Sequence, residues 1–131
     1  PVVCELAYTW FCPKENSRIL DPFAGGSVRG IVAATMGHDY TGIELRPEQV
    51  ESNIEQANKI FEEKEKKPKW IVGDSNKILD NLNDGVQSNQ LEEFDFVFSC
   101  PPYGNLEIYS DMQVMQDIKT RGISLFCCGR I

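Results

Sequence analysis

Residues 18–27 read Arg18-Ile19-Leu20-Asp21-Pro22-Phe23-Ala24-Gly25-Gly26-Ser27, and this stretch decides the fold. Its first four residues are typical of a short buried strand, and the two glycines favour a tight turn. Because glycine has no side chain, the backbone of the turn can adopt positive φ and approach a ligand closely. Ser27 is a residue type that caps helices, and it predicts a helix that runs to about Met36, where Gly37 ends it.

The same alternation of strands and helices continues on both sides of this unit. Before it, apolar residues 2–11 predict a helix that Pro13 ends. After it, we expect strands within residues 40–44, 70–73, 94–99 and 122–128 and a long polar helix from Pro47 to about residue 66, with an apolar stripe of Val50, Ile54, Ala57, Ile60 and Phe61. We also expect a short helix near residues 78–82 and a loop at 83–93. Such alternation is typical of a doubly wound α/β fold with a mostly parallel sheet. The pattern weakens after about Met112, so we expect the sheet to be incomplete at its C-terminal side.

The composition is that of a globular domain. The chain has 131 residues, of which 41% are hydrophobic and 25% are charged. No apolar run approaches the roughly 20 residues that a membrane span needs, and no signal-peptide pattern opens the chain, so a cytoplasmic location is expected. The formal net charge of -7 argues against a chain that binds nucleic acid by itself, because phosphate binding needs a basic face.

The cysteines do not predict a metal site. The chain has 5 cysteines and 1 histidine, and no two cysteines stand at the short spacing of paired zinc ligands. An odd number of cysteines without a framework spacing is typical of reduced thiols. We therefore expect no metal.

Polar residues stand at the ends of the predicted strands, where doubly wound sheets bind their ligands. Glu44 ends the second strand, at the position from which an acidic residue accepts hydrogen bonds from ribose hydroxyls; alternatively it is an exposed acid that caps the helix beginning at Pro47. Asp74 and Ser75 follow the third strand and are candidates for a purine amino group; alternatively Asp74 caps the next helix. The glycine-rich turn lacks the full dinucleotide fingerprint and by itself equally fits a phosphate or a plain turn.

The most unusual element is Cys100-Pro101-Pro102-Tyr103, which follows the fourth strand. Two prolines stiffen the backbone and remove two N–H donors, while their carbonyls remain acceptors. Such acceptors can hold the hydrogens of an aromatic amine, and the ring of Tyr103 can stack on the base, which in a duplex must first be flipped out. This arrangement suits methylation of an exocyclic amino group. The alternative is a rigid turn or a proline-rich docking segment.

Together these residues resemble the S-adenosylmethionine-dependent DNA amino-methyltransferases, which modify N6 of adenine or N4 of cytosine. The turn is similar to their D-P-F-x-G-x-G cofactor loop, with the second glycine shifted. The resemblance implies that S-adenosylmethionine is bound by Asp21, Pro22, Phe23, Ala24, Gly25, Gly26, Ser27, Glu44, Leu45, Asp74 and Ser75. It implies that the catalytic residues are Cys100, Pro101, Pro102 and Tyr103.

One position departs from this family. Its members place Asp, Asn or Ser directly before the two prolines, whereas this chain has Cys100, a weak acceptor, and Ser99 stands one position too early. Both adenine and cytosine therefore remain candidate targets. The interval between Asp74 and Cys100 is too short for a target-recognition domain, so we expect DNA to be contacted through a region outside this chain.

The resemblance implies a single Rossmann-like methyltransferase domain over residues 1–131, in a phage or bacterial protein of the restriction-modification type. In it, the helix at residues 2–11 would cover the methionine end of the cofactor. Three alternatives remain open: a methyltransferase that acts on RNA guanine, one that acts on protein glutamine, and a non-catalytic module that binds the cofactor. The sequence does not indicate an oligomeric state.

Overall fold

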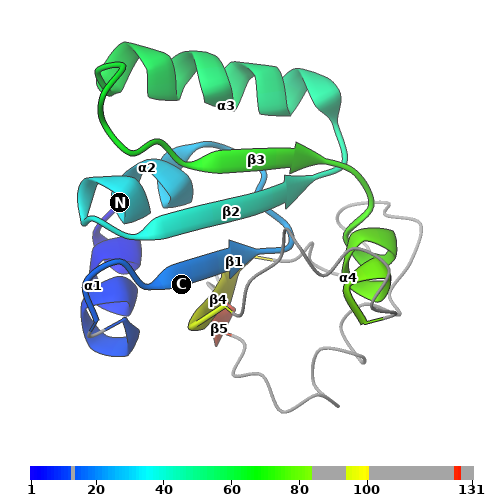
Figure 1. The fold of residues 1–131 in the computed structure, drawn as a ribbon, viewed down its shortest axis with the longest axis horizontal. Coiled ribbons are helices and arrows are strands. Elements are labelled where there is room, and N and C mark those ends of the chain that lie inside the picture. Colours follow the sequence, from blue (N-terminus) through cyan, green and yellow to red (C-terminus); the bar gives the residue numbers. More distant parts are fainter. Residues whose placement is uncertain (13, 84–93, 101–125, 128–131) are drawn as a thin grey trace.

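The chain forms a parallel sheet with helices on both faces (Figure 1). The computed structural model describes residues 1–12, 14–83, 94–100 and 126–127. Its elements, in chain order, are α1 (Val2–Phe11), β1 (Arg18–Asp21), α2 (Val28–Thr35), β2 (Asp39–Glu44), α3 (Pro47–Ile60), β3 (Lys69–Val72), α4 (Ser75–Asn83), β4 (Phe96–Ser99) and β5 (Phe126–Cys127). Within these residues, no helix is long and apolar enough to cross a membrane.

The strand order is β3-β2-β1-β4-β5, and every neighbouring pair is parallel. The order reverses between β1 and β4, because the chain first builds outward through β2 and β3 and then returns to the other side of β1. At such a reversal the connections leave in opposite directions and open a crevice at the carboxyl ends of the strands. The predicted doubly wound α/β fold is confirmed.

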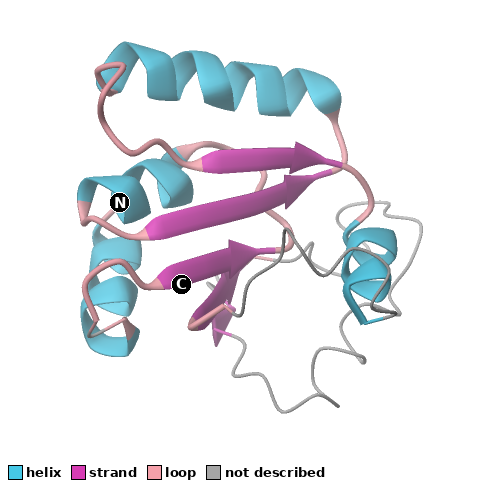
Figure 2. Cartoon of the chain, viewed as in Figure 1, coloured by secondary structure: helices cyan, strands magenta, loops and turns pink. Residues whose placement is uncertain are grey.

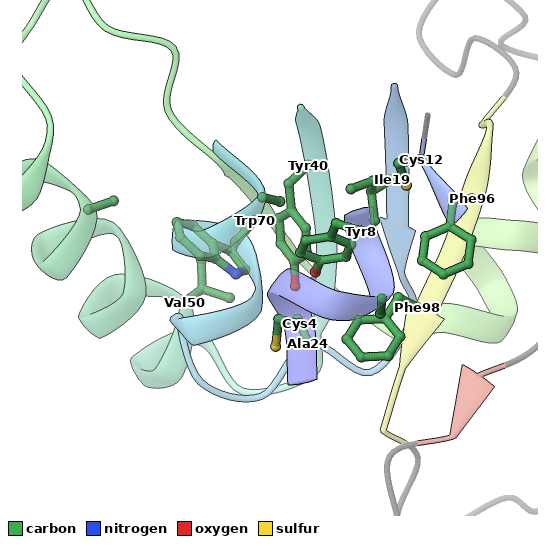
Figure 3. Close-up of a cluster of buried hydrophobic side chains, with 13 residues drawn as sticks. Cys4, Tyr8, Cys12, Ile19, Ala24, Tyr40, Val50, Trp70, Phe96 and Phe98 are labelled. Atoms are coloured by element: carbon green, nitrogen blue, oxygen red, sulfur yellow. The ribbon is translucent and has the colours of Figure 1, made fainter. Parts of the chain in front are cut away.

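The sheet is covered differently on its two faces (Figure 2). On one face, α1, α2 and α3 enclose the larger core, in which Tyr8, Tyr40, Trp70 and Phe98 meet (Figure 3). The ring centroids of Tyr8 and Phe98 lie 5.5 Å apart in an edge contact. On the other face, α4 covers a smaller cluster of Leu20, Ile43 and Val97. The strands are thus apolar on both sides, as strands of parallel sheets usually are.

Glycine allows the helix and strands to approach closely in the larger core. A Cβ atom at Gly30 in α2 would lie 2.8 Å from the indole of Trp70. A Cβ atom at Gly42 in β2 would lie 2.9 Å from the same indole and 2.7 Å from the Cβ of Ala24. The large side chain of Trp70 therefore fills the space that these two glycines leave, and it fixes α2 against the sheet.

Several predicted boundaries differ from the structure. The helix α3 ends at Ile60 rather than near residue 66, because Phe61 already has the extended dihedral angles φ -102 and ψ 137. The strand β4 begins at Phe96 rather than at residue 94, and the carboxylate of Asp95 just before it accepts a hydrogen bond from the N–H of Arg18. Of the strand expected within residues 122–128, β5 is the part that lies inside the described residues. The loop expected at 83–93 lies outside them except for Asn83, which is the last residue of α4 and not part of a loop.

Candidate cofactor site

The glycine-rich turn lies at the carboxyl ends of the strands, and neighbouring strand ends contact it directly. At the end of β2, Oε2 of Glu44 accepts a hydrogen bond from the N–H of Gly25 at 3.0 Å. After β3, the hydroxyl of Ser75 donates to the carbonyl of Pro22. At the end of β4, Ser99 contacts the turn from the other side. The structure therefore brings together predicted site residues from β1, β2 and the start of α4.

The backbone of the turn has one constrained and one open glycine. Gly25 has φ +52, in the left-handed region where a side chain is strained. Gly26 is exposed, and a Cβ atom there would meet no described atom within 4 Å. The N–H of Ala24 donates to the carbonyl of Ile43 at 2.9 Å and anchors the turn on β2. The open side of Gly26 is the place where a ligand can come close to the backbone.

The side chain of Asp21 lies at the centre of the hydrogen bonds that support this turn. Its side chain is completely buried. Oδ2 accepts hydrogen bonds from Nε of Arg29 at 2.5 Å and from the hydroxyl of Tyr40 at 2.7 Å. Oδ1 accepts from the hydroxyl of Ser99 at 2.6 Å and from the N–H of Phe23 at 3.2 Å. These four donors give Asp21 a structural role, and a direct contact between its carboxylate and the cofactor stays a prediction.

Arg29 is a site residue that the sequence analysis missed. Its Nη2 donates to the carbonyls of Phe23 and Ala24, both at 2.7 Å, so that one guanidinium holds two carbonyls of the turn and the Asp21 carboxylate. Burial alone lowers the pKa of Arg29, but the charge of Asp21 and the hydrogen bond to it outweigh burial and raise that pKa. A signal existed: Arg29 is the first cationic residue after Asp21 in the chain.

The Tyr40 hydroxyl acts as a neutral donor to the same carboxylate. Burial is the main cause that raises the pKa of Tyr40 well above its ordinary value, and the neighbouring charge of Asp21 raises it further. The phenol therefore keeps its proton and donates it to Oδ2 of Asp21. Among the residues that the structure describes, the network around Asp21 thus contains one carboxylate, one guanidinium and two hydroxyl donors.

The helix α3 supports the turn through polar side chains rather than through the expected apolar stripe. Asn53 is completely buried, and its Nδ2 donates to the carbonyl of Gly25 at 2.7 Å. Val50 and Ala57 are buried as predicted, whereas Ile54 and Ile60, predicted on the same stripe, are exposed. The buried face of α3 therefore contains Asn53 in place of Ile54, and Asn53 contacts the turn.

Ser27 precedes α2 as predicted, but it does not cap the helix with its side chain. Its hydroxyl donates instead to Oε1 of Gln56 in α3. Ser27 itself has helical dihedral angles, φ -72 and ψ -17, so its side chain points away from the amides that a capping residue would bind. The predicted capping bond is thus wrong, and Ser27 instead ties the end of the turn to α3.

Glu44 lies between the turn and the start of α3. Besides its contact with Gly25, it accepts through Oε1 from the N–H of Arg46 at 3.0 Å. The guanidinium of Arg46 lies 3.4 Å from the same oxygen and is largely exposed. Leu45 is exposed beside it, with 54% of its surface accessible. Carboxylate oxygens have further acceptor capacity, so Glu44 can still receive hydroxyl donors.

Asp74 makes the contact that its alternative interpretation predicts. Its Oδ1 accepts from the N–H of Asn76 at 3.0 Å in the first turn of α4, and its carbonyl accepts from Ile78 at 3.0 Å. Asp74 is half-buried. Its contact with the cofactor adenine stays a prediction. Ser75 is buried and engaged with the turn.

At the end of β4, the neighbouring residues Ser99 and Cys100 differ in burial. Ser99 is completely buried, donates to Asp21 and accepts from the N–H of Phe23 at 3.1 Å. It is therefore not at the surface, where it would have to be to accept from a target amine in place of Cys100. Cys100 is half-buried, and Pro101-Pro102-Tyr103 lies outside the described residues.

The strand order, the glycine-rich turn after β1 and the acid at the end of β2 are features of doubly wound sheets that bind a nucleotide cofactor at their strand ends. A crystal structure described as the SAM-dependent methyltransferase from Agrobacterium tumefaciens has this fold, with a TM-score of 0.61 and 19% identity; the match covers 77% of this chain and 31% of that one. This chain belongs to the RNA cap guanine-N2 methyltransferase family, whose family model matches residues 16–125. No curated protein sequence matches it.

The cofactor is thus S-adenosylmethionine, as expected. The described residues fit it, because Gly26 leaves open space beside the backbone and Glu44 offers a carboxylate to hydroxyl donors. The expected membership of a methyltransferase family is confirmed, whereas the expected DNA specificity is not. The family instead favours the alternative of an RNA guanine.

Proposed function

We propose that the protein transfers the methyl group of S-adenosylmethionine to the exocyclic N2 amino group of a guanine in RNA. The observation that carries this proposal is the family match over residues 16–125, which spans the glycine-rich turn and Cys100-Pro101-Pro102-Tyr103 in one stretch. The chain supplies both the strand ends that hold a cofactor and the segment that suits an aromatic amine.

On the cofactor side, this chain would contribute a shaped backbone and one carboxylate. The turn is held by Arg29 and Asn53, so the open side of Gly26 is fixed before any ligand arrives. Glu44 would accept hydrogen bonds from the ribose hydroxyls, and the exposed Leu45 would contact the flat base. When bound, the cofactor supplies an electrophilic methyl group.

On the acceptor side, the difficulty is the weak nucleophile. The lone pair of a guanine amino group is delocalised into the ring. Carbonyl acceptors at the Cys100-Pro101-Pro102 segment would hold the amine hydrogens, and the Tyr103 ring would stack on the base. Orienting two bound reactants contributes up to about 7–11 kcal/mol to lowering a barrier, so positioning alone can account for much of the rate.

Calorimetry tests the cofactor half of the proposal. Glu44→Ala should weaken binding of S-adenosylmethionine by roughly 10- to 100-fold, because hydrogen bonds to a charged group contribute about 1.5–3 kcal/mol each. Glu51→Ala is the matched control, since Glu51 is an exposed glutamate on α3. Equal affinities of the two variants would refute the role of Glu44.

Transfer of a labelled methyl group tests the acceptor half. The full-length protein should label capped RNA, and mass analysis should identify the product as N2-methylguanosine, with uncapped RNA as the comparison. A second candidate is a DNA base, favoured by the order of D-P-F-A-G-G and C-P-P-Y in the chain. Label found only as N6-methyladenine or N4-methylcytosine in duplex DNA would replace the first proposal with this one. Label only on protein glutamine, or binding without transfer, would refute both.

A further inference from the structure

Ser99 connects the cofactor turn to the segment that follows β4. It is the last residue of β4, and Cys100-Pro101-Pro102-Tyr103 comes directly after it. Its hydroxyl donates to Oδ1 of Asp21 at 2.6 Å and accepts from the N–H of Phe23 at 3.1 Å. Both partners belong to the stretch that leads into the turn. Ser99 is completely buried, so no solvent competes for these bonds.

The hydrogen bond between Ser99 and Asp21 lies just beyond the end of the backbone pairing between β1 and β4. The paired residues of β1 and β4 are Ile19 with Phe96 and Leu20 with Val97, and the ladder ends there. Beyond it, the connections from the two strands leave in opposite directions. The bond between Ser99 and Asp21 therefore joins the strand ends after the ladder can no longer do so.

Asp21 is itself a fixed point. Arg29 and Tyr40, from α2 and β2, each donate to its Oδ2. Because these two donors hold the Asp21 carboxylate in place, Asp21 in turn holds the Ser99 hydroxyl. The position of Ser99 therefore depends on β1, β2 and α2.

We propose that Ser99 is a positioning residue that sets Cys100 at a fixed distance from the cofactor turn. The inference rests on the proposed function, in which the amine is held from Cys100 onward and the methyl donor by the turn. Misplacing one reactant by about 1 Å can cost roughly 100-fold in rate. Loss of the Ser99 hydroxyl should therefore lower turnover more than it lowers cofactor affinity.

The kinetic test compares Ser99→Ala with Ser17→Ala in the full-length protein. Ser17 is a matched control, because its hydroxyl is also buried but donates to the carbonyl of Lys14, ahead of β1 and away from the strand ends. With saturating cofactor and acceptor, Ser99→Ala should lower kcat by roughly 10- to 100-fold, while its Kd for S-adenosylmethionine changes by less than about 3-fold. Ser17→Ala should leave both within about 2-fold of wild type. Equal kcat values for the two variants, or a loss confined to cofactor affinity, would overturn the inference.

A second measurement needs no activity. The rate of Cys100 alkylation, read by mass spectrometry of its own peptide in the native protein without ligand, reports how firmly this half-buried residue is held. Ser99→Ala should raise that rate several-fold and Ser17→Ala should not; equal rates would count against the inference. If the wild type methylates DNA instead of RNA, the proposed function fails, and the kcat comparison is made on DNA. If it methylates nothing, the alkylation rates decide.

Discussion

Arg29 is the residue whose loss should destabilise the surroundings of the cofactor turn most. Arg29→Met keeps an unbranched side chain of similar length but removes the guanidinium. The substitution deletes the 2.5 Å bond to Asp21 and two 2.7 Å bonds to carbonyls of the turn. Asp21 is completely buried, so its carboxylate would be left with neutral donors only.

The expected loss in the free energy of unfolding follows from the burial of the Arg29–Asp21 ion pair. Removing one partner of a buried ion pair costs about 3–5 kcal/mol. The Arg29 side chain is 19% exposed and that of Asp21 is 0% exposed, so we expect the lower end, about 3 kcal/mol. Domains are stable by about 5–15 kcal/mol, so the variant should still fold. At an m-value of about 2 kcal/mol per M, the urea midpoint should fall by about 1.5 M.

Urea unfolding followed by circular dichroism measures this shift, and two further variants control it. Arg46→Met makes the same chemical change at a guanidinium that is 64% exposed and 3.4 Å from Glu44, where the cost should be at most about 1 kcal/mol. Adding Asp21→Asn to Arg29→Met should recover part of the loss, because the unpaired charge is gone. Equal midpoints for Arg29→Met and Arg46→Met would refute the reasoning, as would a further loss in the double variant.

Three other predictions concern the turn, the core and pH. Gly26→Ala should leave stability nearly unchanged, because its Cβ would enter only the open space beside the turn, but it should weaken cofactor binding by roughly 10-fold in calorimetry. Gly25→Ala should instead cost about 1–2 kcal/mol of stability, because Gly25 has φ +52. Gly42→Ala should cost about 1–3 kcal/mol in urea unfolding, since the new Cβ would lie 2.9 Å from Trp70; an unchanged midpoint would disprove this packing. Burial lowers the pKa of His38, and the charge of Lys66 lowers it further. The unfolded chain thus binds a proton near pH 6.5 that the folded chain does not, so stability should fall as the pH drops below about 6.5, and thermal melts of His38→Gln should lack this part of the decline.

The fold was predictable because each strand is short, apolar and followed by a polar or glycine signal. That pattern alone was enough to predict the order of the elements and the position of the turn. The end of α3 was predicted too late because the visible breaker is Pro68, whereas the chain leaves the helix at Phe61 without a glycine or proline. Helix ends that depend on local dihedral angles rather than on a breaker leave little trace in a sequence.

The support of the turn was harder to predict, because it depends on contacts between distant residues. Asn53 lies 28 positions from Gly25 in the chain, and nothing local links them. Periodicity assigned the buried face of α3 to Ile54, and the actual face includes its neighbour Asn53. Adjacent helix residues differ by about 100° in direction, so an error of one residue exchanges an apolar support for a hydrogen-bonding one. Asp21 illustrates the same limit: the motif predicted a ligand contact, and the fold surrounds the side chain with protein donors.

The register of β4 determines which side chain is buried beside Asp21 and which lies one position further on, at the end of the strand. Phe96 and Phe98 belong to the larger core, with their rings 6.1 Å apart and 12° from parallel, whereas Val97 belongs to the smaller cluster on the other face. A slip by one residue would move Ser99 to the place that Cys100 now occupies, but it would also turn both phenylalanines away from the larger core, because side chains alternate between the faces of a strand. Burying an aromatic side chain contributes about 1.5–3 kcal/mol, which is more than one neutral hydrogen bond contributes. Core packing therefore keeps Cys100 at that position, and we expect backbone carbonyls rather than a side-chain amide or carboxylate to accept the hydrogens of the target amine.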